Sequence, residues 1–189
     1  KAFSQNDKRE VVRILSQGVN IILIITVPAT IGIMLLSGPM VQLFFQRGAF
    51  SSNASIMTSG ALTLYSIGLV AAALRLMLNK VFYSFQDTRT PMINGAIAVG
   101  LNIVLNLILI KSLQHRGLAL ATSISAIVTT FLLFYSLRKR LGQLGISKMV
   151  MVFAKTLFAS IIMGVFVYLI YYKLGVALPQ GKIIQVLML

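Results

Sequence analysis

Long apolar stretches separated by short polar or basic segments dominate this sequence. Each stretch has about 20 residues or more, the length that an α-helix needs to cross a hydrocarbon core about 30 Å thick. Five such stretches lie at residues 18–36, 56–85, 92–110, 118–137 and 151–172. The pattern predicts an all-α, polytopic bundle of membrane-spanning helices. A sixth apolar segment at 182–189 is too short to cross a membrane.

Helix-breaking and capping residues mark the expected limits of these spans. Residues 37–39, Ser-Gly-Pro, are expected to end the first span. Segment 40–55 would then lie at the membrane interface, because it is too short to form a span of its own. Thr90 is expected to cap the third helix, with Pro91 at the first helical position.

The composition agrees with a membrane protein and changes how the charge is interpreted. Hydrophobic residues make up 58% of the chain, charged residues 11%, and the mean hydropathy is +0.92. A net charge of +14 would indicate nucleic-acid binding in a soluble protein. Here the cations lie between apolar runs, where they act as topology signals, so we expect no nucleic-acid partner.

The distribution of cations predicts the orientation of the chain. With residue 1 inside the cell, twelve cations fall in or near the cytoplasmic side: Lys1, Lys8, Arg9, Arg13, Arg75, Lys80, Arg89, Arg138, Lys139, Arg140, Lys148 and Lys155. Five fall on the other side: Arg47, Lys111, Arg116, Lys173 and Lys182. Because cytoplasmic loops carry the excess of Lys and Arg, the basic loop 138–149 is expected in the cytoplasm.

The second apolar stretch contains the candidate for a functional cation. At 1.5 Å of rise per residue, Arg75 lies roughly 18 Å from the loop residue Asp87, and Lys80 lies roughly 10 Å from it. Lys80 can therefore reach the headgroups, whereas Arg75 lies deeper and should face a protein or water-filled interior. Asn79 lies one turn after Arg75 on the same predicted face.

Polar and small side chains line single faces of the later spans, which favours helix packing. The third span carries Asn94, Ala98, Asn102 and Asn106 at intervals of four residues. The fourth carries Ala119, Thr122, Ser125, Ala126 and Thr129, and the fifth carries Ser160 and Gly164. For the amides we favour interhelical hydrogen bonds over direct contact with a substrate.

The residues needed for covalent chemistry are scarce. The chain has no Cys, one His, His115, and three acidic residues, Asp7, Glu10 and Asp87, which lie far apart. Such a set cannot assemble a metal site or an acid–base pair. We therefore expect no cofactor, no metal and no enzymatic activity.

Four sequence strings together resemble one family. They are GPMVQLFFQRGAF at 38–50, VFYSFQDTRTPM at 81–92, LNIVLNLILI at 101–110 and GLALATSISA at 117–126. These strings resemble the MurJ (MviN) family of lipid II flippases, within the multidrug/oligosaccharidyl-lipid/polysaccharide (MOP) exporter superfamily.

The resemblance implies a two-lobe transporter around a cationic cavity, of which this chain is part of the second lobe. Residues 1–137 would be second-lobe helices, 138–149 the basic cytoplasmic loop, and 150–189 a groove-forming helix pair with its second helix truncated. The first lobe would belong to the missing N-terminal part of the same polypeptide. The implied location is the bacterial cytoplasmic (inner) membrane.

A lipid-linked anionic substrate, lipid II by resemblance, would then be a partner together with the membrane lipids. The family acts in peptidoglycan biosynthesis, and so in cell-wall biogenesis and cell shape. A cation in the cavity would offset the desolvation of a pyrophosphate as it crosses the hydrocarbon. The candidate substrate-binding residues are Arg75, Asn79, Lys80, Asn102 and Asn106.

Three functions remain open on the sequence. The first is lipid II flipping by alternating access, and the second is export by a MATE-like drug or metabolite antiporter or by another lipid-linked polysaccharide exporter. The third is a structural membrane subunit, for which Arg75 should have an internal partner. No carboxylate lies inside these spans, which favours the flippase over a cation-coupled antiporter.

The orientation can be tested by thiol labelling, since the chain has no native Cys. Single cysteines at Ser52 and Gln114 should react with a membrane-impermeant reagent added to intact cells. Cysteines at Ser84 and Gln143 should react only after the cells are permeabilised. Labelling of the opposite pair would reverse the assigned orientation.

Overall fold

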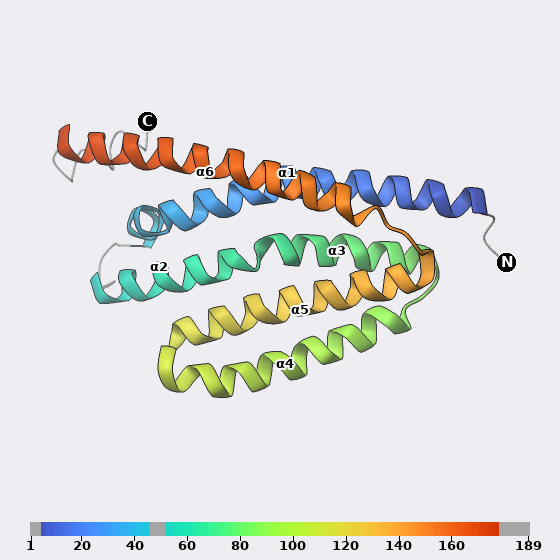
Figure 1. The fold of residues 1–189 in the computed structure, drawn as a ribbon. Helices are drawn as coiled ribbons and strands as arrows, with labels where there is room; N and C mark the ends of the chain where they lie inside the picture. Colours follow the sequence, from blue (N-terminus) through green and yellow to red (C-terminus); the bar gives the residue numbers. More distant parts are fainter. Residues whose placement is uncertain (1–4, 46–51, 178–189) are drawn as a thin grey trace.

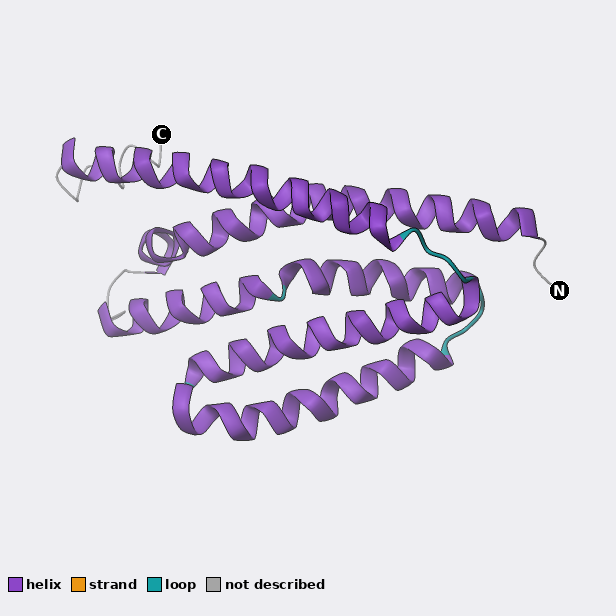
Figure 2. Ribbon diagram, in the orientation of Figure 1, coloured by secondary structure: helices purple, strands orange, loops and turns teal. Residues whose placement is uncertain are grey.

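The described part of the chain is helical throughout. The computed structural model describes residues 5–45 and 52–177, and Figure 2 shows helices joined by short connections in this part, with no strand drawn there. The helices are α1 Gln5–Phe45, α2 Ser52–Ile67, α3 Leu69–Ser84, α4 Arg89–Leu113, α5 His115–Leu141 and α6 Ile146–Ala177 (Figure 1). The predicted all-α fold class is confirmed.

The helices have the length and composition of membrane spans. Helices α1, α4, α5 and α6 are each long and apolar enough to cross a membrane, and α2 and α3 together, across their bend, have the length and composition of a fifth span. These match the five spans that the sequence predicts. The protein is a multi-pass membrane protein.

Successive spans run in opposite directions (Figure 1). The start of α1, the connection from α3 to α4 and the connection from α5 to α6 lie at one end of the bundle, and the turn from α4 to α5 lies at the other. The first end carries Arg9, Arg13, Arg89, Arg138, Lys139, Arg140 and Lys148, and the second carries Lys111 and Arg116. The structure thus separates the cations as the sequence analysis predicts.

Helix α5 packs against α2, α3 and α4 through small side chains. Ala119, Ser125, Ala126 and Thr129 are buried as predicted, although Thr122 is exposed. A Cβ atom added at Gly117 would lie 2.6 Å from the carbonyl oxygen of Leu109, so α4 and α5 come within backbone contact near their turn. Small residues permit this approach, which matters because lipid gives little hydrophobic drive for helices to associate.

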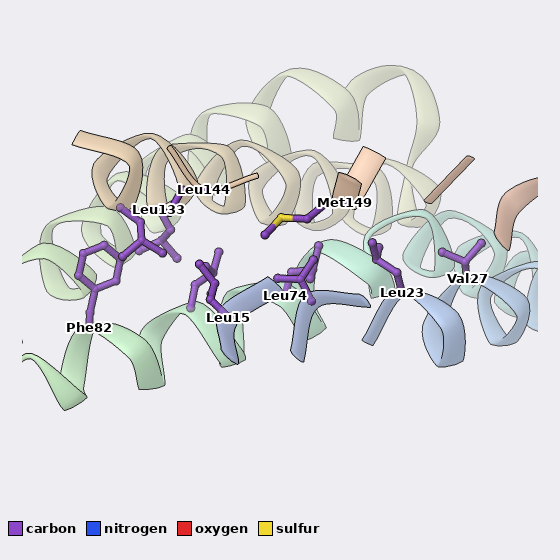
Figure 3. Packing of buried hydrophobic residues seen from close by; sticks show 11 residues of the cluster. Leu15, Leu23, Val27, Leu74, Phe82, Leu133, Leu144 and Met149 are labelled. Carbon is purple, nitrogen blue, oxygen red and sulfur yellow. The ribbon is translucent and has the colours of Figure 1, made fainter. Parts of the chain in front are cut away.

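A second packing centre joins α1 to the bundle (Figure 3). Its buried residues come from α1, α3, α5, the α5–α6 connection and α6: Leu15, Val19, Leu23, Val27, Leu74, Leu78, Phe82, Leu133, Leu137, Leu144 and Met149. Leu15, Leu78 and Leu133 are each at most 1% exposed. Close packing of these side chains holds α1 and the start of α6 against α3 and α5.

The first helix is longer than predicted. The expected break at Pro39 does not occur, and 40–45 belongs to α1 rather than to a separate interfacial segment; residues 46–51 lie outside the described part. The last turns of α1 turn aside from its long axis (Figure 1). Buried Ser37 hydrogen-bonds with Thr63 of α2 at 2.9 Å. Such contacts with a neighbouring helix let membrane helices tolerate proline.

The second predicted span, 56–85, is not one straight helix. Helices α2 and α3 meet at Gly68 with a bend of 45°. A Cβ atom at Gly68 would lie 2.7 Å from the Cα atom of Ser123, so the backbone of α5 comes closer than any other residue type would allow. The long apolar run therefore folds as two helices against α5.

The cap of α4 differs from the predicted one. The helix begins at Arg89 with Thr88 at the N-cap position, whose side chain makes no cap hydrogen bond, and the preceding residue Asp87, not Thr90, supplies the oxygen that accepts from the first turn. Asp87 Oδ1 accepts the backbone N–H of Thr90 at 3.0 Å, and Oδ2 accepts the Thr90 hydroxyl at 2.9 Å. Thr90 therefore donates to the capping carboxylate of Asp87. The sequence alone does not show whether Thr90 donates in this way or accepts as a capping residue.

The predicted basic loop is mostly helical. Helix α5 continues through Arg138, Lys139 and Arg140 to Leu141, so the connection to α6 shortens to residues 142–145. Cations suit the last turn of a helix because its free carbonyls carry partial negative charge. The division of the chain at 138–149 stays a prediction.

Helix α6 packs on α1 through the predicted small pair. Ser160 and Gly164 are its buried residues near mid-length, and a Cβ atom at Gly164 would lie 2.9 Å from Leu35 Cδ1. The helix extends to Ala177, past the turn expected from residue 174. The predicted sixth segment, 182–189, lies outside the described residues.

Asp87 also links the start of α4 to the end of α5 through an ion pair with Arg140. Arg140 Nη1 lies 2.8 Å from Asp87 Oδ2, and the guanidinium lies 4.9 Å from the centre of the Phe85 ring. The Thr90 N–H, then the Thr90 hydroxyl and Arg140, hold the pKa of Asp87 below its ordinary value against the opposing effect of desolvation. The stability that Asp87 contributes is fully present above the ordinary carboxyl pKa of about 3.9 and is lost as the pH falls through the lowered pKa.

We expect Asp87→Ala to lower the melting temperature of the complete gene product in detergent. Loss of a helix cap costs about 1 kcal/mol, and the partly exposed ion pair adds less. The difference from the unsubstituted protein should narrow as the pH falls below about 3.9. Glu10→Ala is the control, because the pair of Glu10 with Arg13 is more than half exposed on both sides. A difference that stays constant with pH would contradict this role.

Candidate functional site

A cleft of about 470 Å³ lies between the bent α2–α3 pair, α4 and α5. Helix α5 lies between α3 and α4 (Figure 1) and contributes small side chains to the cleft. The lining residues are Tyr65, Gly68, Leu69, Ala72, Arg75, Ala98, Val99, Asn102, Ile103, Thr122, Ser123, Ser125 and Ala126. Apolar, amide and hydroxyl groups thus surround one formal charge, that of Arg75.

Arg75 lies on α3, two turns beyond the bend at Gly68. Its side chain is half-buried and lines the cleft, as expected of a cation at this depth. Within residues 5–45 and 52–177, the guanidinium has no hydrogen-bond or ion-pair partner. Five N–H donors therefore remain available to an acceptor that enters the cleft.

The amides of α4 form a short hydrogen-bonded ladder. Asn102 donates to the Thr122 hydroxyl of α5 at 3.3 Å, and Asn106 donates to the Asn102 carbonyl oxygen at 2.9 Å. The expected interhelical hydrogen bond is confirmed at Asn102. Asn106 Oδ1 and Asn94 Nδ2 are buried without a partner in the described part of the chain.

The structure brings together only some of the predicted site residues. Arg75 and Asn102 line the same cleft, and Asn106 is connected to it through Asn102. Asn79 is half-buried one turn further along α3, and Lys80 is exposed; neither lines the cleft. Lys80 is thus placed to reach toward headgroups, as its position in the sequence indicates.

Ser123 is a cleft residue that the sequence analysis missed. It is 2% exposed, and its hydroxyl donates across the helix boundary to the carbonyl oxygen of Leu64 at 2.6 Å. The signal in the sequence is weak, because Ser123 lies among other small residues of α5. The Leu64 carbonyl that accepts from Ser123 lies at the Gly68 bend, where the Gly68 N–H donates to Tyr65 instead.

The acidic side chains that the structure describes lie at one end of the bundle. Glu10 is in the first turns of α1, and Asp87 is in the connection from α3 to α4. No group of three or more His, Cys, Asp or Glu side chains that could hold a metal ion occurs in the described ranges.

The sequence profile of the family described as "Lipid II flippase MurJ" matches residues 1–185. The chain belongs to the MurJ family. The resemblance noted in the sequence is thus confirmed over nearly the whole chain.

Curated relatives carry the same family name. A probable lipid II flippase MurJ of Rickettsia prowazekii is 32% identical over all of this chain and 38% of its own length. One of Vibrio cholerae is 39% identical over 64% of this chain and 23% of its own length. The chain therefore spans well under half the length of these MurJ relatives.

A solved structure supports the fold. The lipid II flippase MurJ in an inward closed conformation superimposes with a TM-score of 0.68 at 27% identity. The match covers 90% of this chain and 40% of that chain. The described helices therefore adopt the arrangement of part of a MurJ transporter.

Proposed function

We propose that this chain supplies part of the second lobe of a lipid II flippase that works by alternating access. Membership of the MurJ family supports a lipid-linked substrate. The short match to MurJ relatives supports a role for this chain as part of a larger two-lobe transporter. The bacterial inner membrane, with residue 1 and 138–149 in the cytoplasm, is part of the same proposal.

The unpaired Arg75 is the observation that carries the proposal. A guanidinium at this depth is costly, and a structural arginine would be expected to pair with an internal acceptor. Arg75 has no such partner among the described residues. An anionic headgroup that enters the cleft would supply the missing acceptor, and pyrophosphate oxygens match the planar fork of arginine.

Flipping requires no covalent step from these residues. The transported headgroup must exchange water for protein contacts while it crosses the hydrocarbon. Arg75 would offset the desolvation of the anion, and Asn102 and Thr122 would offer polar contacts beside it. Asn79 and Lys80 would act nearer to the membrane surface, Lys80 by attracting anionic headgroups.

Two substitutions of Arg75 in the complete gene product test this role. Arg75→Lys keeps the charge but removes the two-pronged donor, so it should keep normal abundance and reduce the complementation of a flippase-depleted strain by about tenfold or more. Arg75→Ala should reduce complementation further. Growth and protein abundance are measured together.

Lys80→Ala is the control, because Lys80 lies on the same helix outside the cleft. It should have a milder effect than either substitution of Arg75. Normal growth with both Arg75 variants at unchanged abundance would remove Arg75 from the substrate site.

A further inference from the structure

At the Gly68 bend, the carbonyl oxygen of Leu64 accepts a hydrogen bond from a different donor than it would in a continuous helix. In a continuous α-helix, the N–H of Gly68 would donate to the carbonyl oxygen of Leu64. Here it donates to the carbonyl oxygen of Tyr65 at 3.1 Å. The Leu64 oxygen instead accepts the hydroxyl of Ser123 at 2.6 Å, and the same hydroxyl lies 3.3 Å from the Tyr65 oxygen.

The hydroxyls of α5 make two kinds of contact: some donate within the helix, and others, such as Ser125 to the Ala98 carbonyl of α4, donate to a neighbouring helix. Thr122 donates to Leu118 and Thr129 to Ser125, both within their own helix. Ser123 donates only to the α2 backbone, at the point where α2 ends. The buried glycine at position 68 lets the two backbones approach closely enough for this bond.

The Leu64 carbonyl depends on the Ser123 hydroxyl in the bent arrangement, because the Gly68 N–H donates to Tyr65 instead. The Gly68 N–H would satisfy the same carbonyl in a straight arrangement. A carbonyl in an apolar surrounding cannot be left without either donor except at a high cost. The choice of donor is thus coupled to the angle between α2 and α3.

We propose that Ser123 is a positioning residue for the cleft. Its hydroxyl holds α3 at 45° to α2 and thereby places Arg75, two turns beyond the bend, beside α4 and α5. The link to transport rests on the function proposed above. The proposed effect of Ser123 on the bend angle does not depend on that function.

The angle between α2 and α3 can be followed by double electron–electron resonance, which measures the distance between two spin labels. The labels are introduced into the complete gene product in a cysteine-free background. Spin labels are placed at Ser52→Cys and Ser84→Cys, which lie exposed at the far ends of α2 and α3. Two helices of 16 residues each, bent by 45°, should have ends about 4 Å closer than a straight helix of the same length. Ser123→Ala should therefore lengthen the label distance by about 4 Å.

Thr130→Val is the matched control. Thr130 also donates from α5 to a carbonyl of α3, that of Ala71 at 2.8 Å, which lies inside the helix three residues beyond Gly68, and it donates to Ala126 of its own helix as well. The Thr130→Val substitution should leave the distance between the two spin labels unchanged. Ser123→Gly removes the same hydroxyl without adding volume, and this variant serves if Ser123→Ala fails to accumulate.

Transport is measured on the same variants as lipid II translocation in liposomes. The proposal expects Ser123→Ala to lengthen the distance and to reduce translocation, with Thr130→Val unchanged in both. An unchanged distance in Ser123→Ala, or in Ser123→Gly where that variant replaces it, would show that the hydroxyl does not set the bend and would overturn the proposal. A longer distance with full translocation would overturn the positioning role while leaving the function of Arg75 untouched.

Discussion

The fold depends on the need to satisfy every backbone polar group where no water is available. Helix α5 meets this need for three neighbours through short hydroxyl side chains: Ser123 donates to α2, Thr130 to α3, and Ser125 to the Ala98 carbonyl of α4 at 2.7 Å. Such bonds require close backbones, which explains the small residues along α5. A broken helix is tolerated at Gly68 because one of these hydroxyls takes over the freed carbonyl.

The cleft is a consequence of the same arrangement. The bend separates α3 from α4 while both stay packed on α5, and Arg75 lies in the space between them. Asn102, which accepts from Asn106, places an amide on the otherwise apolar α4 wall without a carboxylate. An unpaired cation beside neutral hydrogen-bonding groups can favour an anion without trapping it through a permanent internal ion pair. Reversible binding of this kind suits a transporter, which must also release its substrate.

Local patterns were sufficient to predict the apolar helices and the small-residue faces. They were not sufficient for features that depend on residues far apart in the chain. The hydrogen bond at the Gly68 break joins Ser123 to Leu64, 59 positions away in the chain. Asp87 and Thr90 can both cap a helix, and only the three-dimensional turn decides between them. Asn79 shares a face with Arg75 but lies one turn outside the cleft, because α4 leaves room only beside the bend.

The central claim is that Arg75 makes this cleft a water-accessible site for anions, and a charge-selective thiol reaction tests it most directly. Val99→Cys lies in the cleft, whereas Val104→Cys is an exposed position on the same helix outside it. In the complete gene product, the cleft cysteine should react several-fold faster with a small anionic thiol reagent than with a cationic one. Arg75→Gln should abolish that preference, and Val104→Cys should show none that depends on Arg75. An unreactive Val99→Cys, or the same preference with and without Arg75, would contradict the account.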